Sequence, residues 1–375
     1  MRIDLLITEI DVGGAEQCLA AIAIELRRRG HAVRLIAIGP PPPADRDRLL
    51  QGLVQRGTDV RFLIASTAGT STASRRRNAV RLPAALRQLI REDRPDVALS
   101  FLFHANTLAA LCYPAAGVPL AYGVRLADPS QLRAVVSRFA YRRGSRVICV
   151  AESVRRHVVA KEGAPAEKTT VITNGIDVDA WREKMRSDRH VAELAEQPFA
   201  LFVGRYASQK RIEWILRLAE DSRFESCGLQ VVMIGDGPLS SSVAHVAASY
   251  PNRLVNLGRR DDIAAWMAAA QMLLLPSRYE GMPNVVLEAM ASGLPVAATD
   301  VEGIRELLGS QAQEQCVPAE DEAAWRQLVL RMASDAPLRQ ELGAANLLRC
   351  REAFQLQDRL AEYEAVLKRI VAEAV

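Results

Sequence analysis

The sequence predicts an α/β protein made of two doubly wound domains, each a parallel sheet with helices on both faces. Short apolar runs alternate with longer helix-like segments, an order typical of parallel strands joined by helices. The alternation fills the first half of the chain and repeats after a polar stretch, 177–197, that is the best candidate for an inter-domain linker. A chain of 375 residues is also too long for one ordinary core. We therefore expect domains over 1–180 and 181–354 and a C-terminal helix over 355–375. Two such domains facing each other would bring the carboxyl ends of both sheets to a shared central cleft, where ligands bind.

The first half opens on the apolar run Arg2–Ile7, which predicts a strand, followed by a glycine turn and a helix over 17–29 that Gly30 ends. Residues 65–78, rich in Ser, Thr, Ala and Arg, predict a mobile loop. The same pattern of apolar runs predicts the other strands of this half at Ala32–Ile38, Val60–Leu63, Val97–Phe101, Leu120–Tyr122, Val147–Val150 and Thr170–Ile172, and helices at 79–92, 105–112 and 154–162 with a basic helical segment between the strands at 120 and 147.

The second half repeats the alternation and ends in a tail that is helical from Ala319 onward. Its strands are predicted at Ala200–Val203, Gln230–Ile234, Leu254–Leu257, Met272–Leu275 and Pro295–Ala298.

Composition narrows the class of protein. Charged residues make up 25% of the chain and hydrophobic residues 49%, which is typical of a soluble globular protein. No apolar run is long enough to cross a bilayer, and the N-terminus begins with strand-like IDLLI where a signal peptide would have another layout. The six cysteines form no C-x-x-C pair, so we expect neither a zinc site nor a disulfide framework, and a reducing cytoplasm.

The net charge of +4 is unevenly distributed. Residues 1–180 hold 26 Lys and Arg against 17 Asp and Glu, a net charge of +9, and the remainder has a net charge of −5. A basic half suggests an acidic partner such as a phospholipid surface, a lipid diphosphate or a nucleic acid, although a generally arginine-rich composition would explain it equally well. Many of its arginines fall close together: Arg75, Arg76, Arg77, Arg133, Arg138, Arg142, Arg143, Arg146, Arg155 and Arg156.

The stretch 276–295, PSRYEGMPNVVLEAMASGLP, reads as a loop, a helix and the start of a strand, directly after a buried strand. Glu280 lies in the loop and Glu288 two turns along the helix. A helix N-terminus favours an anion such as a phosphate, and from there Glu288 could reach a ribose. Carboxylates suit sugar hydroxyls because each accepts several hydrogen bonds. For a bare E-x7-E, two solvated surface residues would be the better interpretation.

The longer string EGMPNVVLEAMASGLPVAATDVEGIRELL, residues 280–308, closely resembles the donor-binding segment of the retaining nucleotide-sugar glycosyltransferases of the GT-B fold, family 4. The resemblance implies two Rossmann-like domains facing a central cleft, with the last helix crossing back onto the first domain. It implies transfer of a hexose from a UDP-sugar or GDP-sugar, with retention, to a hydroxyl of a glycan or lipid-linked saccharide, in assembly of a cell-surface polysaccharide such as lipopolysaccharide.

Gly204, Arg205 and Lys210 follow a predicted strand, where a ligand contact is expected, although surface cations near a helix start are the alternative. The resemblance implies that both cations clamp the donor diphosphate and that Glu280 orients the sugar. His104, after the strand ending at Phe101, is the fourth catalytic candidate, or else a partly buried polar residue. The expected donor-binding set is Gly13, Gly14, Gly204, Arg205, Lys210, Gly235, Gly281, Met282, Pro283, Asn284, Val285 and Glu288.

The acceptor is expected to contact Glu16, Asn106 and Arg125, the last of which could instead form a surface salt bridge. Two D-x-D triplets, Asp45–Asp47 and Asp177–Asp179, match a metal-bound nucleotide-sugar motif, but neither follows a suitable strand, so we expect no metal and no cofactor.

Two rival functions stay open: a nucleotide-sugar 2-epimerase of the same fold, and a non-catalytic subunit that only binds sugar nucleotides. As partners we expect the donor, the acceptor and an anionic membrane surface, and no nucleic acid. The expected location is the cytoplasm, with peripheral attachment to the inner face of the plasma membrane.

Overall fold

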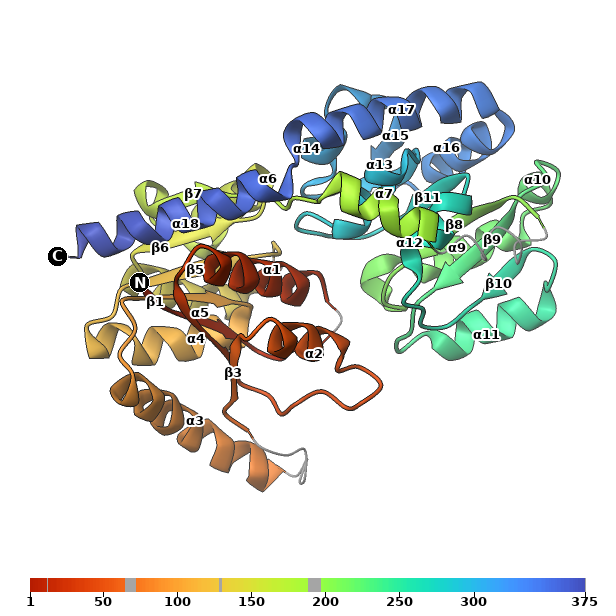
Figure 1. Ribbon diagram of the computed structural model, residues 1–375. Coiled ribbons are helices and arrows are strands. Elements are labelled where there is room, and N and C mark those ends of the chain that lie inside the picture. The colour runs from red at the N-terminus through yellow and green to blue at the C-terminus, as the bar shows by residue number, and fades with distance from the viewer. Residues whose placement is uncertain (12, 65–71, 128–129, 188–196, 375) are drawn as a thin grey trace. The chain divides into compact units, whose positions relative to one another are not determined.

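The computed structural model describes residues 1–11, 13–64, 72–127, 130–187 and 197–374, and side chains in this range except those of 72–80. The chain divides into two compact units (Figure 1). Unit 1 comprises Met1–Thr173 and Asp358–Val375, and unit 2 comprises Asn174–Gln357, compared with the predicted boundaries after residues 180 and 354.

Unit 1 contains, in its described residues, a seven-stranded parallel sheet in the order β3-β2-β1-β4-β5-β6-β7. Strand β1 lies between β2 and β4, and its side chains from Ile3 to Ile7 are all buried. In-register pairing with β2 runs from Arg2 opposite Ala32 to Ile7 opposite Ala37. The strands are β1 (Arg2–Ile7), β2 (Ala32–Ala37), β3 (Asp59–Phe62), β4 (Val97–Phe101), β5 (Leu120–Val124), β6 (Arg146–Cys149) and β7 (Thr169–Val171).

Helices connect these strands. The strand order grows from β1 toward β3 on one side and from β4 toward β7 on the other, so right-handed crossovers place helices on both faces, as the sequence predicts. On one face α3, α4 and α5 pack side by side. The helices are α1 (Gly14–Arg28), α2 (Arg48–Gln55), α3 (Thr72–Glu92), α4 (Phe103–Cys112), α5 (Gln131–Arg143), α6 (Glu152–His157) and α18 (Leu356–Glu373), with short turns η1 (Pro114–Ala116), η2 (Val158–Glu162) and η3 (Ala166–Lys168).

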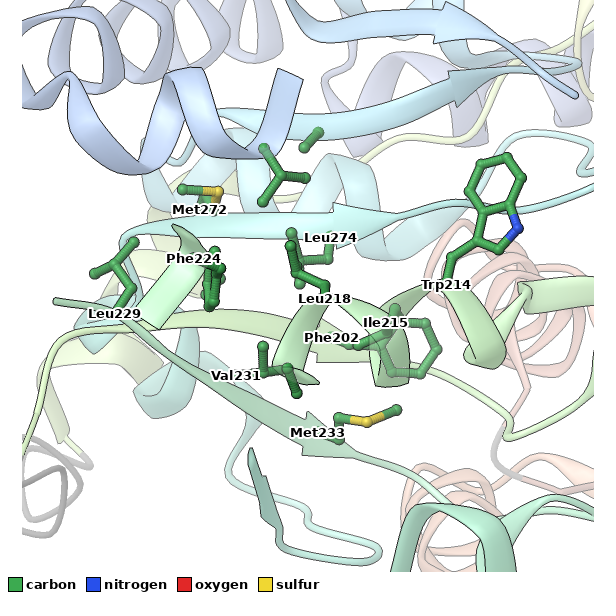
Figure 2. Close-up of a cluster of buried hydrophobic side chains, with 14 of the residues drawn as sticks. Phe202, Trp214, Ile215, Leu218, Phe224, Leu229, Val231, Met233, Met272 and Leu274 are labelled. Atoms are coloured by element: carbon green, nitrogen blue, oxygen red, sulfur yellow. The ribbon is translucent and has the colours of Figure 1, made fainter. Parts of the chain in front are cut away.

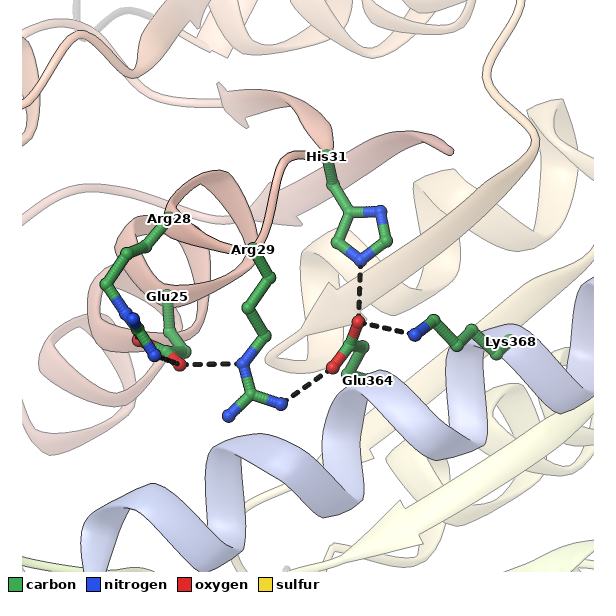
Figure 3. Close-up of polar contacts among 6 residues, drawn as sticks. All are labelled: Glu25, Arg28, Arg29, His31, Glu364 and Lys368. Carbon is green, nitrogen blue, oxygen red and sulfur yellow. Dashed lines mark hydrogen bonds and ion pairs between the residues drawn. The ribbon is translucent and has the colours of Figure 1, made fainter.

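The last helix, α18, is held in unit 1 by an ionic cluster around Glu364 (Figure 3). The carboxylate accepts a hydrogen bond of 2.7 Å from Arg29 and lies 2.8 Å from His31 Nε2 and 2.7 Å from Lys368 Nζ. Hydrogen bonds from Lys368, His31 and Arg29 together lower the pKa of Glu364 to about 2. Arg29 and His31 come from the end of α1 and the turn before β2. The cluster therefore joins the two segments of the chain that form unit 1.

Unit 2 contains, in its described residues, a six-stranded parallel sheet in the order β10-β9-β8-β11-β12-β13. The strands are β8 (Phe199–Val203), β9 (Gln230–Ile234), β10 (Leu254–Asn256), β11 (Met272–Leu275), β12 (Val296–Asp300) and β13 (Cys316–Pro318). The helices are α7 (Val178–Ser187), α9 (Ile212–Glu220), α10 (Ser222–Glu225), α11 (Ser240–Ser249), α12 (Ile263–Ala269), α13 (Asn284–Ser292), α14 (Ile304–Leu308), α15 (Ala312–Gln315), α16 (Glu322–Ser334) and α17 (Ala336–Ala353), with short turns η4 (Ser208–Lys210) and η5 (Gly309–Gln311).

Alternate residues of the strands build the core of unit 2, because successive side chains of a strand point to opposite faces. Val231 and Met233 of β9 lie on the same face as Met272 and Leu274 of β11, where they meet α9 (Figure 2). The opposite face packs against α12, where Phe199 and Trp266 meet edge to face with ring centroids 5.8 Å apart. A sheet buried on both faces explains why its strands read as continuous apolar runs.

Two sequence-based predictions are wrong, and one strand was not predicted. Residues 72–78 begin α3 where a mobile loop was expected, and the three successive arginines 75–77 have good helix propensity; residues 65–71 lie outside the described part. The expected linker begins with α7, because the indole of Trp181 donates to Ser292 Oγ at 2.8 Å and fixes this helix on unit 2; residues 188–196 are not described. Strand β13 was missed because it has three residues and ends on Pro318.

None of the described helices combines the length and the hydropathy that a membrane span requires.

Candidate functional site

The candidate site of unit 2 lies at the carboxyl ends of its central strands. The strand order reverses at β8, which pairs with β9 on one side and β11 on the other. In an open parallel sheet, ligands bind outside the carboxyl ends of the strands at such a reversal. The loop after β8 carries Gly204, Arg205 and Lys210, and the loop after β11 carries Glu280. The structure therefore brings these four predicted residues to adjacent loops.

Glycines allow the loops to approach one another closely. Gly235, after β9, has φ +154°, and a Cβ there would collide with the carbonyl oxygen of Gly204. Gly303, after β12, has φ +77°, and a Cβ there would collide with the carbonyl oxygen of Gly281. Because no other residue fits at these contacts, the two glycines fix the position of the backbone on both sides of the strand reversal. Gly235 was predicted and Gly303 was missed.

Lys210 and Glu280 form an ion pair across the strand reversal. Lys210 Nζ lies 2.5 Å from Glu280 Oε1, and the same oxygen accepts a hydrogen bond of 2.6 Å from Ser277 Oγ. The Glu280 side chain is 8% exposed, and its other oxygen, Oε2, has no partner among the described residues. A buried carboxylate with one oxygen fixed and one oxygen open is well placed to accept hydrogen bonds from hydroxyl groups of a ligand.

Arg205 is exposed, and its guanidinium has neither a hydrogen bond nor an ion pair with any described residue. Its neighbours in the loop are fixed, since the backbone N–H of Tyr206 donates to the carbonyl of Asp236 at 2.9 Å. A guanidinium group free of internal partners, on a fixed backbone, can bind an anion without breaking an existing contact. Arg205 and Lys210 thus supply one free and one paired cation to the same loop.

Glu288 lies on α13, and its half-buried carboxylate has no hydrogen-bond partner among the described residues. Burial raises the pKa of Glu288 to about 7, although the positive charge of Lys184 opposes this shift. Removing an unpaired carboxylate from water is unfavourable unless a ligand later supplies donors. The unpaired carboxylate of Glu288 is therefore available to accept hydrogen bonds from a ligand.

Asn174, which sequence analysis did not assign to the site, fixes the start of α13. Its amide nitrogen donates to the carbonyl of Met282 at 2.8 Å and to Asn284 Oδ1 at 2.7 Å. Asn174 is 5% exposed, and its backbone N–H also points to the sulfur of Met282 at 3.3 Å. These contacts hold the loop 281–285, which contains the predicted residues Gly281, Met282, Pro283, Asn284 and Val285. Only the three-dimensional structure brings residue 174 to this loop.

In unit 1 the predicted residues follow β1, β4 and β5, and the strand order of that sheet reverses between β1 and β4. Gly13 caps α1, Gly14 begins it, and the Glu16 carboxylate folds back so closely over Gly13 that a Cβ there would collide with it. Burial, followed by the charges of Glu9 and Asp11, raises the pKa of Glu16.

Arg125, after β5, has partners within unit 1. Its guanidinium lies 5.1 Å from the centre of the Phe101 ring and donates to the hydroxyl of Tyr363 at 3.2 Å. Neither of these two partners is charged, and the predicted alternative, a surface salt bridge, stays open. The contact with an acceptor stays a prediction.

The residues after β4 differ in accessibility. His104 is exposed and meets Phe103 edge to face, with ring centroids 5.4 Å apart. Asn106 is 8% exposed and its Oδ1 accepts a hydrogen bond of 2.7 Å from Ser100 Oγ, so packing alone accounts for its side chain. Leu102, which the sequence did not single out, has φ +74° and ψ +151°, a conformation that costs a non-glycine residue about 1–3 kcal/mol and is concentrated at functional sites.

No group of three or more His, Cys, Asp or Glu side chains in the described part of the chain is arranged to hold a metal ion. The D-x-D candidates have structural partners: Asp177 Oδ1 accepts the backbone N–H of Ala180 at 2.9 Å, and Asp179 pairs with Arg351 at 3.2 Å.

Both halves of the chain match family models of glycosyltransferases. The family model described as Glycosyltransferase Family 4 matches residues 12–180, and the one described as Glycosyl transferases group 1 matches residues 197–335. An uncharacterized glycosyltransferase of Methanocaldococcus jannaschii is 31% identical over 173 residues, 44% of each chain. A putative teichuronic acid biosynthesis glycosyltransferase of Bacillus subtilis is 26% identical over 228 residues, 58% of this chain and 57% of that protein. The chain spans about half the length of the curated relatives it matches.

Among solved structures, HepE of Anabaena in complex with UDP-glucose aligns with a TM-score of 0.82 and 20% identity, over 98% of this chain and 100% of that one. The likeness confirms the predicted GT-B fold with two Rossmann-like domains.

Proposed function

This chain belongs to the group 1 glycosyltransferases, and from that premise we propose that it is an enzyme that transfers a sugar from a nucleoside-diphosphate sugar to a hydroxyl group, with retention at the anomeric carbon. The observation that carries the proposal is the pair of Lys210 and Glu280 across the strand reversal, with the free cation Arg205 in the same loop.

In the proposed reaction the donor diphosphate binds Arg205 and Lys210. Negative charge grows on the diphosphate as its bond to the sugar breaks, and fixed cations stabilise that charge more strongly in the transition state than in the bound donor. The departing oxygen removes the proton from the incoming hydroxyl, and the new bond forms on the face that the diphosphate leaves, which gives retention. Glu280 orients the sugar, and Glu288 accepts hydrogen bonds from the ribose.

The donor is a UDP-sugar or a GDP-sugar, and a bound UDP-glucose in the structural relative HepE favours the uridine nucleotide. The acceptor is a glycan or lipid-linked saccharide in cell-surface polysaccharide assembly, a proposal that the teichuronic acid relative supports. The acceptor would contact Glu16, Arg125 and Asn106, of which Asn106 is the most buried. A cytoplasmic enzyme attached to an anionic inner membrane surface fits such a lipid-linked substrate.

A thermal-shift panel of nucleotide sugars tests the proposal. A donor at a hundred times its dissociation constant adds about 2.7 kcal/mol of apparent stability, so the correct donor stands out. Transfer of labelled sugar from that donor then separates the enzyme from its rivals. Epimerised sugar nucleotide formed without acceptor would favour a 2-epimerase, and binding without transfer or hydrolysis would favour a non-catalytic subunit.

Full transfer activity is expected in the presence of EDTA, because Asp177 and Asp179 have structural partners and Arg205 and Lys210 can supply the charge that a metal would otherwise provide. Transfer rates with and without chelator are the measurement. A loss that manganese or magnesium restores would contradict this expectation and return the two D-x-D triplets to consideration.

The Glu288→Gln variant is expected to bind free nucleoside diphosphate more weakly, because the ribose loses a carboxylate acceptor. The wild-type protein should also bind free nucleotide more weakly as the pH falls below the Glu288 pKa of about 7, by up to about tenfold per pH unit. The reason is that a protonated Glu288 must release its proton before it can accept hydrogen bonds from both ribose hydroxyls. Calorimetric titration with UDP and GDP between pH 5.5 and 8 tests both effects, and this dependence should disappear in Glu288→Gln. An unchanged affinity for free nucleotide, with impaired transfer, would move Glu288 from ribose binding to another role.

A further inference from the structure

Helix α5 exposes a stripe of large apolar side chains. Leu132, Val135 and Phe139 are 77%, 67% and 49% exposed. Their spacing of three and four residues places them on one side of the helix, while Ala140 and Tyr141 face the interior of unit 1. Leu111 of the adjacent helix α4 is 41% exposed. Exposed apolar side chains gathered in one place, unlike scattered ones, mark an interaction surface.

Arginines border this stripe. Arg143 lies 5.3 Å from the centre of the Phe139 ring and donates to the carbonyl of Ala110 at 3.0 Å. Arg138 and Arg142 are exposed and have no hydrogen bond or ion pair with the described residues. We use the term α5 face for these seven residues: Leu111, Leu132, Val135, Arg138, Phe139, Arg142 and Arg143.

Among the residues that the structure describes, negative charge is nearly absent around the α5 face. Helices α4 and α5 contain no Asp or Glu. The carboxylate contributed by η2, Glu162, is buried and accepts a hydrogen bond of 2.9 Å from Tyr141. Helix α3, which packs beside α4, has the acidic residue Glu92 only at its end, hydrogen-bonded to Gln88. No carboxylate of the described residues therefore pairs with Arg138 or Arg142.

The structure also limits which arginines contribute. Arg146 is paired with Glu373 at 2.8 Å and Arg155 with Glu152 at 2.7 Å, so these two members of the sequence cluster are neutralised within unit 1. Arg138 and Arg142, whose side chains have no such partner among the described residues, lie next to the exposed apolar side chains, and Arg156 of α6 is a further exposed arginine outside the α5 face. Charge and hydrophobicity thus coincide on one helix face.

We propose that the α5 face docks unit 1 on an anionic lipid bilayer. Leu132, Val135 and Phe139 enter the boundary between head groups and acyl chains, while the arginines keep their alkyl stems on the apolar stripe and bind lipid phosphates. An apolar stripe alone would suit a second protein, but the surrounding unpaired arginines and the lack of carboxylates are complementary to a dense layer of phosphates. This inference rests on the proposed function, because it explains how the enzyme would reach a lipid-linked acceptor.

Sedimentation of the full chain with vesicles tests the proposal. Vesicles of equal parts phosphatidylglycerol and phosphatidylcholine should bind the protein at low salt, pure phosphatidylcholine should bind it weakly, and high salt should release it from the anionic vesicles. Replacing Arg138, Arg142 and Arg143 by serine should lower the partition coefficient by roughly fivefold per arginine. Replacing Leu132, Val135 and Phe139 by serine should lower it by about two orders of magnitude.

Matched controls come from the same chain. The exposed apolar residues Val54 and Leu348 and the exposed arginines Arg56 and Arg369 lie outside the α5 face, so their serine variants should bind vesicles as the wild type does. Donor binding in the thermal-shift panel should be unchanged in every α5 variant, which separates failure of this inference from failure of the proposed function. Equal binding to neutral and anionic vesicles, or loss in the control variants, overturns the proposal. Self-association in ultracentrifugation that the Leu132, Val135 and Phe139 variant abolishes, without vesicle binding, assigns the face to a second copy instead.

Discussion

Replacing Arg205 or Lys210 by alanine is expected to lower the rate of sugar transfer by about two orders of magnitude or more, the effect of losing one charge contact to the transition state. The structure predicts that the two variants differ in stability. The Arg205 side chain is exposed and without partners among the described residues, so Arg205→Ala should unfold at the wild-type temperature. Lys210→Ala leaves the carboxylate of Glu280 buried with Ser277 as its remaining side-chain donor, which costs about 1–3 kcal/mol.

Steady-state transfer assays and thermal unfolding on the same samples measure both effects. Arg331→Ala provides the control, since Arg331 is an exposed arginine of unit 2 that pairs with Glu314 on another part of the unit. Near-normal turnover in both the Arg205 and Lys210 variants, with an intact fold, would exclude the diphosphate clamp. If only Lys210→Ala lost turnover, the ion pair of Lys210 with Glu280 would be the contact that the reaction needs, and Arg205 would not.

The strands of both sheets could be predicted because they are buried on both faces, and burial on both faces requires continuous apolar runs such as 272–275 and 97–101. The failures lie where other contacts decide. Helix α7 looks polar in sequence, and it is the packing of Trp181 on unit 2 that makes it part of a domain. Strand β13 follows the polar run 313–315 and ends on Pro318, so no apolar run marks it, unlike the equally short β10.

The candidate site was predictable where a motif and a strand end coincide, as for Arg205, Lys210 and Glu280. The supporting residues were not, because nothing in the sequence links Asn174 to Met282, which lies 108 positions away. Backbone strain at Leu102 is equally invisible, since leucine ordinarily avoids positive φ. Burial of Asn106 is equally hidden in the sequence, since only the structure shows that this polar residue near a strand end accepts a hydrogen bond from Ser100.

Arg211 is the residue whose position the structure explains most fully and the sequence least. It follows Lys210 directly, has φ +46° although it is not glycine, and is 1% exposed. Its guanidinium donates to the carbonyl of Ser277 at 3.4 Å and to the carbonyl of Ala319, and pairs with Glu320. It also lies 4.5 Å from the centre of the Trp214 ring.

These contacts make Arg211 a positioning residue for the ion pair of Lys210 and Glu280. Arg211 follows Lys210 directly in the chain, and its side chain donates a hydrogen bond to the carbonyl of Ser277. The Ser277 hydroxyl in turn donates to Glu280 Oε1, the oxygen that pairs with Lys210. The Ser277 carbonyl accepts a second hydrogen bond of 2.6 Å from Thr299, so the start of this loop is restrained from two directions. Losing the guanidinium should therefore disturb both members of the pair.

Arg211→Met is expected to reduce kcat for sugar transfer by about tenfold or more, with a smaller effect on KM, because misplaced charges lower transition-state stabilisation more than donor binding. It should also lower the free energy of unfolding by about 1–3 kcal/mol, since the carbonyl groups of Ser277 and Ala319 lose a buried charged donor. Arg217→Met is the matched control: Arg217 lies on α9 and pairs with Glu322, but it is exposed, so its loss should cost at most about 1 kcal/mol and leave kcat unchanged. Arg211→Lys should recover part of kcat by retaining the charge. Equal kcat in the Arg211 and Arg217 variants at a temperature where both are folded would show that Arg211 stabilises unit 2 without positioning the site.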